Sequence, residues 1–247
     1  MRNLTFILPF LIFQLLLRTG NSQVPDEILK KVDQNISSEN RIMESSMTIH
    51  GKRSTRTITS RSWGEGVKKS FTEYLSPPAE KGTKMLKLDG QLWIYSPSTD
   101  RIIQIAGHML RQSVMGSDLS YEDMMDDRKL HDIYMASMER TDTLEGREVW
   151  VLNLAAKVPD VAYHSQKIWI DRERYIPLKQ EMYAKSGQLL KETVLKDVRK
   201  VQERWFPFTM VYKDMLKQGQ GTEFKITAIR FNQQIPGYIF TKAALKQ

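Results

Sequence analysis

Residues 84–96 read KMLKLDGQLWIYS, and this stretch decides the fold. Asp89-Gly90 between two runs of alternating apolar and polar residues predicts a β-hairpin with a two-residue turn. With the turn at this position, Leu86 lies directly opposite Trp93 on the neighbouring strand. Four side chains are then expected to share one face of an antiparallel sheet: Leu86, Leu88, Trp93 and Tyr95.

The same period-two alternation recurs along most of the chain. Strands are expected near residues 41–50, 54–62, 67–75, 84–89, 91–96, 101–106, 131–139, 147–155, 161–171, 175–185, 188–199, 203–213 and 221–231. Short turns separate them, many with Gly or Pro. This pattern predicts one antiparallel sheet, either strongly curved or closed.

A second hairpin is expected around Ser186-Gly187. This turn places Met182 and Leu195 on one face and charged side chains on the other, as in a sheet with one covered and one solvated face. It also sets Glu181 opposite Glu192, which is unfavourable unless a lysine lies between them.

Two segments are expected to be helical. The first begins near Pro25 and places four apolar side chains on one side: Ile28, Leu29, Val32 and Ile36. The second spans about 117–127, where Ser120 and Asp123 have the spacing of a capping box. The fold class is therefore mainly β with two short helices (α+β). Two short helices cannot fill the concave side of so large a sheet, which leaves a packed interior or a cavity.

The N-terminal residues 1–22 have the layout of a secretory signal peptide. Arg2 precedes an uncharged run from Leu4 to Leu17, and small residues follow up to Ser22. The 14-residue run is shorter than the ~20 residues that span a bilayer. We therefore expect export through a cleavable signal and a single mature domain over residues 23–247.

The composition excludes several classes of function. The chain has no cysteine, so neither disulfides nor thiol chemistry are expected, and its four histidines lack metal-ligand spacing. No nucleophile motif or phosphate-binding loop is present, so we expect no enzyme, no catalytic residue and no cofactor. Removing the signal leaves 35 basic and 29 acidic residues, a charge of +6. That mild excess suits anionic lipid or an acidic partner, whereas the even spread of basic residues argues against nucleic acid.

Two features of the sequence each have both a structural and a functional interpretation. An acidic stretch around residues 118–127 either complements a helix dipole or docks a basic partner. Thirteen methionines either fill the core or form an adaptable surface for varied apolar ligands.

Three segments, in order, resemble the periplasmic outer-membrane lipoprotein-sorting proteins, the LolA-like family, in its large uncharacterised branch. They are the hairpin at 85–97, the segment RQSVMGSDLSYED at 111–123, and the segment KIWID at 167–171 that continues to IPLK at 176–179. With the leading helix, the resemblance covers nearly the whole mature chain.

The resemblance implies a LolA/LolB-like half-barrel, which is a single unclosed, strongly curved antiparallel sheet with a helical lid. It also implies a periplasmic carrier that holds acyl chains of lipoproteins or lipids for transfer towards the outer membrane, with an inner-membrane transporter as a partner and the carrier as a monomer. The residues expected to line the acyl cavity are Leu86, Leu88, Trp93, Tyr95, Ile168, Ile170, Met182 and Leu195. Those expected on the lid are Ile28, Leu29, Val32, Leu119, Met124 and Met125.

One departure from the family pattern matters. The better-known carriers have an Arg-Pro pair before the hairpin whose arginine helps to latch the lid, whereas this chain has Ser76-Pro77-Pro78. A lid latch of that kind is therefore not expected in this chain. The alternative function is a regulatory adaptor of the cell envelope that does not transport, but binds lipoproteins and a membrane-bound partner through the acidic stretch.

Overall fold

The computed structural model describes residues 23–52 and 54–247, so the expected signal peptide at 1–22 lies outside the described residues. The helices are α1 (Gln23–Ile36), α2 (Tyr121–Met125) and α3 (Leu130–Ile133), with 3-10 turns η1 (Gly107–Arg111), η2 (Val114–Gly116), η3 (Gly237–Phe240) and η4 (Lys242–Lys246). The strands are β1 (Asn40–His50), β2 (Thr55–Glu65), β3 (Lys69–Ser76), β4 (Lys84–Leu88), β5 (Gln91–Ser96), β6 (Arg101–Ile105), β7 (Tyr134–Leu144), β8 (Arg147–Ala156), β9 (Ser165–Asp171), β10 (Pro177–Tyr183), β11 (Leu189–Val201), β12 (Arg204–Asp214) and β13 (Gly221–Phe231).

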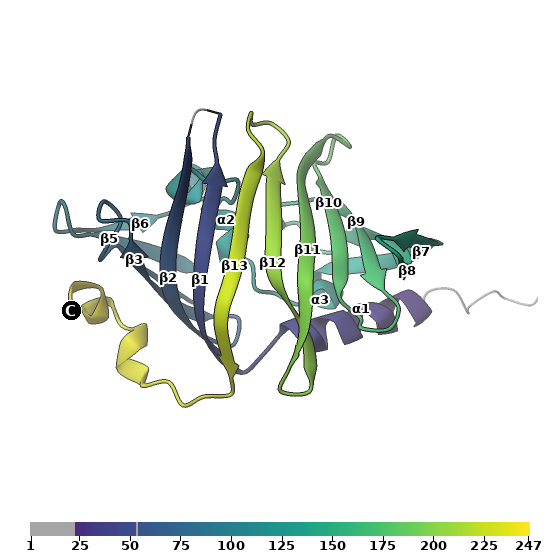
Figure 1. Cartoon of the computed structure of the whole chain (residues 1–247), viewed down its shortest axis with the longest axis horizontal. Helices are drawn as coiled ribbons and strands as arrows, with labels where there is room; N and C mark the ends of the chain where they lie inside the picture. The colour runs from purple at the N-terminus through teal and green to yellow at the C-terminus, as the bar shows by residue number, and fades with distance from the viewer. Residues whose placement is uncertain (1–22, 53) are drawn as a thin grey trace, which may run out of the picture.

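All thirteen strands form one antiparallel sheet in the order β6-β5-β4-β3-β2-β1-β13-β12-β11-β10-β9-β8-β7. Strands β6 and β7 are its two edges and do not pair, so the sheet is unclosed. Figure 1 shows the central strands in front and both ends of the sheet turning away behind them. The expected single, strongly curved, unclosed sheet is confirmed, and each expected strand run overlaps one strand.

The β4–β5 hairpin has the predicted turn and register. Asp89 and Gly90 have φ values of 44° and 82°, the positive values that a type I′ turn requires at both central positions. Leu86 pairs with Trp93, as predicted. The β10–β11 hairpin sets Glu181 opposite Glu192, and Lys179 Nζ lies 2.9 Å from a carboxylate oxygen of each. The lysine resolves the expected repulsion.

Side chains of the helices and side chains of the sheet meet on one face, which we call the inner face. Cross-strand pairing carries this face across the centre of the sheet: Met47 is opposite Phe224, Phe224 opposite Met210, and Met210 opposite Leu195. Because cross-strand partners project to the same side, one apolar row runs through four strands. The opposite side is the outer face.

The helices differ from expectation in extent and number. Within the described residues there are three α-helices, and α2 covers only 121–125 of the expected 117–127. The Ser120–Asp123 capping box is present and starts this helix. Helix α3 occupies 130–133, where a strand was expected to begin at 131. Asp33 of α1 accepts hydrogen bonds from the backbone N–H groups of Leu130 and His131, so a tertiary contact starts α3.

Three coverings pack on the sheet. Helices α1 and α3 cover the inner face at the β7–β9 end. Residues 107–127, which comprise η1, η2 and α2 and which we call the lid segment, cover the inner face over β1–β6. The C-terminal residues 235–245 lie on the outer face of β3–β5, at the left of Figure 1.

Candidate functional site

Three neighbouring pockets lie between the lid segment and the inner face. Their volumes are about 230, 190 and 60 Å³. Leu119 lines all three, Asp123 lines the first two, and Met124 lines the last two. These three lid side chains therefore divide one space, which we call the inner hollow.

The part of the hollow beneath α2 is apolar with small hydroxyl groups. Met43, Phe224 and the lid residue Met124 line the second and third pockets. The floor between them carries three serines, Ser45, Ser60 and Ser62. Methionine side chains are flexible and polarizable, and serine leaves space above the strand, so this wall can adapt to different apolar groups.

The first pocket contains a buried ion pair between the lid and the sheet. Lys191 of β11 donates to Asp123 of α2, and these side chains are 7% and 10% exposed. Tyr163 O–H donates to the other carboxylate oxygen. Burial raises the pKa of the Asp123 carboxyl, but the charge of Lys191 and the hydrogen bonds outweigh it, so the pKa lies below its ordinary value.

A second ion cluster holds the end of the lid segment. Asp127 Oδ2 lies 2.9 Å from Lys87 Nζ of β4, and its Oδ1 lies 3.0 Å from Arg41 Nη2 of β1. Lys87 also donates to the carbonyl oxygen of Met125 at 2.5 Å. The Lys87 side chain is only 4% exposed. A buried lysine without a counter-charge is costly, so Asp127 compensates for burying this one.

The middle of the lid segment is also attached through a carboxylate. Asp118 Oδ2 accepts from the hydroxyl of Thr222 on β13 at 2.7 Å, and Oδ1 accepts from the backbone N–H of Asp214 at 3.0 Å. Asp118, Asp123 and Asp127 thus all point inward. The acidic stretch serves internal contacts in this structure, rather than presenting these three carboxylates to a partner.

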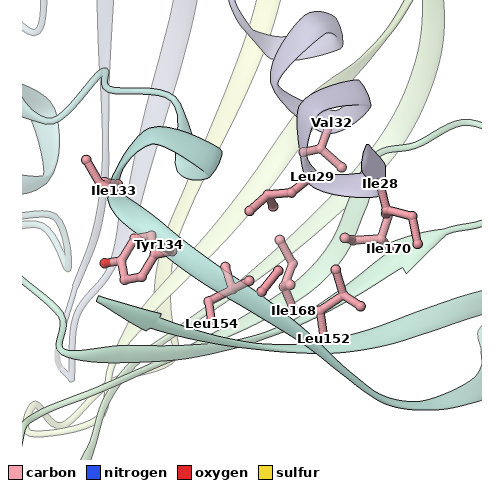
Figure 2. Close-up of a cluster of buried hydrophobic side chains, with 10 residues drawn as sticks. Ile28, Leu29, Val32, Ile133, Tyr134, Leu152, Leu154, Ile168 and Ile170 are labelled. Carbon is pink, nitrogen blue, oxygen red and sulfur yellow. The ribbon is translucent and has the colours of Figure 1, made fainter. Parts of the chain in front are cut away.

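Helix α1 covers its end of the sheet through apolar side chains, and its buried carboxylate, Asp33, bonds to α3 rather than to the sheet. Ile28, Leu29 and Val32 are 4%, 0% and 0% exposed. Figure 2 shows them pointing towards Ile168 and Ile170 of β9 and towards neighbouring side chains of β8. Burial of each such side chain contributes about 1.5–3 kcal/mol, so this contact is a stable apolar seal.

Ten of the fourteen predicted residues fall into three groups. Met182 lines the first pocket and Leu195 lies on the inner face, while Leu119 and Met124 extend from the lid into the hollow. Met125 faces a wider opening of about 550 Å³ at the mouth of the sheet. Ile28, Leu29, Val32, Ile168 and Ile170 are packed together in the seal.

The position of the β4–β5 side chains requires a correction. Leu86, Leu88, Trp93 and Tyr95 share one face, as predicted, but it is the outer face, where the C-terminal segment packs on them. Phe240 and Leu245 contact this group. The assignment of the four side chains to the acyl cavity is therefore wrong, because the alternate residues of the same strands face the lid.

The sequence analysis missed three basic residues of the sheet that bind carboxylates of the lid, namely Arg41, Lys87 and Lys191. A signal was present at Lys87, which lies between Leu86 and Leu88 in an otherwise apolar strand. A charge at such a position has to find a partner when the strand is buried on both faces. The identity of that partner depends on contacts between segments far apart in the sequence.

The helices of the described ranges are all too short or too polar to traverse a bilayer. In the same ranges, His, Asp and Glu side chains form no group of three or more that could hold a metal ion. The inner hollow can offer apolar contact, hydroxyl groups and three basic side chains.

Comparisons with known proteins agree on the fold. A family model described as an uncharacterized protein matches residues 66–247. The solved structure of a DUF1329 family protein from Desulfovibrio piger has a TM-score of 0.84 at 21% identity, covering 92% of this chain and 100% of that one. A domain from Vibrio parahaemolyticus, described as a candidate outer membrane lipoprotein-sorting protein, has a TM-score of 0.80 at 23% identity, covering 92% and 100%.

A third solved structure, of a LolA superfamily protein from Nitrosomonas europaea, has a TM-score of 0.72 at 21% identity and covers 91% of this chain and 99% of that one. At these identities the likeness shows a shared LolA-like fold. No curated protein matches this sequence.

Proposed function

We propose that this chain, which belongs to a family of uncharacterized proteins and has a LolA-like fold, is a periplasmic carrier of acyl chains. The acyl chains of a lipoprotein or lipid enter the inner hollow and are passed towards the outer membrane. The single observation that carries this proposal is the division of the hollow by Leu119, Asp123 and Met124 of one lid segment.

The energetic need for such a carrier follows from the cost of exposing hydrocarbon. Each CH₂ exposed to water costs about 0.8 kcal/mol, so a 16-carbon chain costs on the order of 10 kcal/mol. A protein wall that replaces water removes most of this cost. The methionines and phenylalanine of the hollow provide that wall, and a detachable lid allows the chain to leave.

In this structure the lid side chains leave only small pockets in the inner hollow. Pockets for small molecules usually measure about 300–1,000 Å³, whereas the first and second pockets measure about 230 and 190 Å³. The lid side chains occupy the space between them. Cargo entry therefore requires Leu119 and Met124 to withdraw, which joins the pockets into one space.

The partners proposed for this chain follow from the same function. The carrier takes its cargo from an inner-membrane transporter, works as a monomer in the periplasm and performs no chemistry on the cargo. The regulatory adaptor receives less support, because Asp118, Asp123 and Asp127 of the acidic stretch are engaged within the chain.

Binding of a fluorescent 16-carbon fatty acid to the purified mature chain tests the proposal. Ser62→Trp places a large ring in the second and third pockets and is expected to weaken binding at least about tenfold. Ser98→Trp, on an exposed turn, is the matched control and should leave binding unchanged. Equal binding by both variants, or no binding by the wild type, would contradict the proposal.

A further inference from the structure

The cluster of Asp127, Lys87 and Arg41 has the form of an occupied anion site. Each oxygen of the Asp127 carboxylate contacts a different cation, at 2.9 Å from Lys87 and 3.0 Å from Arg41. The two cations come from strands β4 and β1 of the rigid sheet, whereas the anion comes from the lid segment. The anion is thus on the part that has to move when cargo enters.

Opening the lid changes the energy of this cluster. When Asp127 withdraws, Lys87 and Arg41 stay on the inner face. Lys87 is almost fully buried beneath the lid, and a cargo that takes the place of the lid buries it again. Removing one partner of a buried charge pair is strongly destabilising, because the remaining charge is uncompensated. An open lid is therefore favoured by any cargo that brings its own anion to the same place.

The surroundings of the cluster fit a cargo with both a charged and an apolar part. Arg41 and Asp127 line the second pocket together with Met43, Met124 and Phe224. Lys87 also lines the opening at the mouth of the sheet. An anionic head group between Lys87 and Arg41 would place an attached hydrocarbon chain against the apolar wall of the hollow.

We propose that the cargo is an anionic amphiphile, and that its head group replaces the Asp127 carboxylate between Lys87 and Arg41. This inference rests on the proposed carrier function and names the class of cargo. In this structure Asp127 holds the position proposed for the head group. Charge-assisted hydrogen bonds from arginine and lysine to phosphate or carboxylate are of the strong kind that can provide such recognition.

Calorimetric titration with short-chain lipids below their micelle concentration tests this inference. Dihexanoyl-phosphatidylglycerol and dihexanoyl-phosphatidylcholine have the same acyl chains, but only the first has a net negative charge. In the Asp127→Asn variant the competing carboxylate is gone, so the anionic lipid should bind about tenfold more tightly than to the wild type. The affinity for the phosphatidylcholine should stay within about twofold.

Asp126→Asn is the matched control, because it removes the same charge one residue away. Asp126 pairs with Arg128 at 2.8 Å rather than with the inner cations. Arg41→Gln provides the opposite test, since it keeps the Lys87–Asp127 pair and should weaken binding of the anionic lipid alone, by about threefold or more.

The outcomes separate the head-group inference from the carrier function. If Asp127→Asn strengthens both lipids equally, or if Asp126→Asn has the same effect, the head-group site is wrong and the carrier function stands. If inorganic phosphate binds as tightly as the anionic lipid, the site recognises a free anion, and the inference is overturned. If neither lipid binds to any variant, the carrier function itself fails.

Discussion

Helix α1 and the lid segment cover the same inner face of the sheet by opposite physical means. The contact of α1 is an apolar seal in which Ile28, Leu29 and Val32 are almost fully buried against β8 and β9. The lid segment also has apolar contacts, but its carboxylates Asp123 and Asp127 are held by cations on distant strands.

This difference indicates which cover can open. An apolar seal loses its burial energy when it separates in water, and the side chains of α1 line none of the three pockets that a cargo could enter. In an ion pair, one partner can be replaced by another ion of the same sign, and the new pair offsets the loss of the old one. We infer that α1 is a permanent part of the core and that the lid segment is the movable part.

The largest effect is expected from damage to the seal. Leu29→Ala removes a side chain of zero exposure and leaves a cavity, so it should lower the free energy of unfolding by about 2–5 kcal/mol. Val24→Ala, on the same helix but 57% exposed, should change it by less than about 0.5 kcal/mol. Urea denaturation measures the free energy of unfolding of both variants. Similar losses in the two would show that burial of Leu29 does not make α1 a seal.

A smaller loss is expected from breaking one ion pair of the lid. Lys191→Met leaves Asp123 without its cation, but Tyr163 and Ser120 still donate to that carboxylate. The expected loss is therefore about 2 kcal/mol, within the range for hydrogen bonds to charged groups. The same denaturation experiment measures it, and no loss would mean that the lid is held by its apolar contacts alone.

Removing both charges together should be nearly neutral for stability. Asp123→Asn combined with Lys191→Met leaves no uncompensated ion, so the free energy of unfolding should stay within about 1 kcal/mol of the wild type. The lid loses its charged latch, and a fluorescent fatty acid should associate faster in stopped-flow experiments. Unchanged association kinetics would show that this ion pair does not control opening.

Acid should weaken the lid and leave the seal intact. The pKa of Asp123 in the folded chain lies below its ordinary value of 3.8, so its ion pair contributes stability above that value. The contribution is lost as the pH falls through the lowered pKa. The stability lost in Lys191→Met relative to the wild type should therefore shrink as the pH falls below 3.8, and a loss that stays constant down to acid pH would contradict the assignment.

The smallest effect on binding is expected from a substitution on the outer face, away from both α1 and the lid segment. Trp93 lies under the C-terminal segment, where Lys242 Nζ is 4.1 Å from its ring centroid. Trp93→Phe should leave the affinity for a fluorescent fatty acid within about twofold of the wild type. A larger loss of affinity would indicate that the outer face takes part in binding.

Local features of the sequence predicted the strands, because alternation and turn residues act over a few positions. Asp89-Gly90 and the pairing of Glu181 with Glu192 are examples, and the latter even indicated the need for Lys179. The capping box at Ser120 was likewise predictable. The extent of α2 was not, since Asp118 is tied to Thr222, 104 residues away, and the chain is not helical there.

The local sequence pattern could not predict which face of the first hairpin is the inner face. Both faces of the β4–β5 hairpin are apolar: Leu86 and Trp93 face outward, and Met85 and Leu92 face the lid. Alternation fixes which side chains share a face, but it does not determine which face the C-terminal segment covers. The cavity side of the first hairpin was therefore mistaken, whereas Met182 and Leu195 were placed correctly on the inner face.

The most direct test of the central claim is to lock the lid and measure acyl-chain binding. Asp118 and Thr222 are in hydrogen-bond contact, and the chain has no other cysteine, so Asp118→Cys with Thr222→Cys provides a single disulfide between the lid and β13. The account predicts that the oxidised protein does not bind a 16-carbon fatty acid and that reduction restores binding. Equal binding in the oxidised and reduced forms would contradict it.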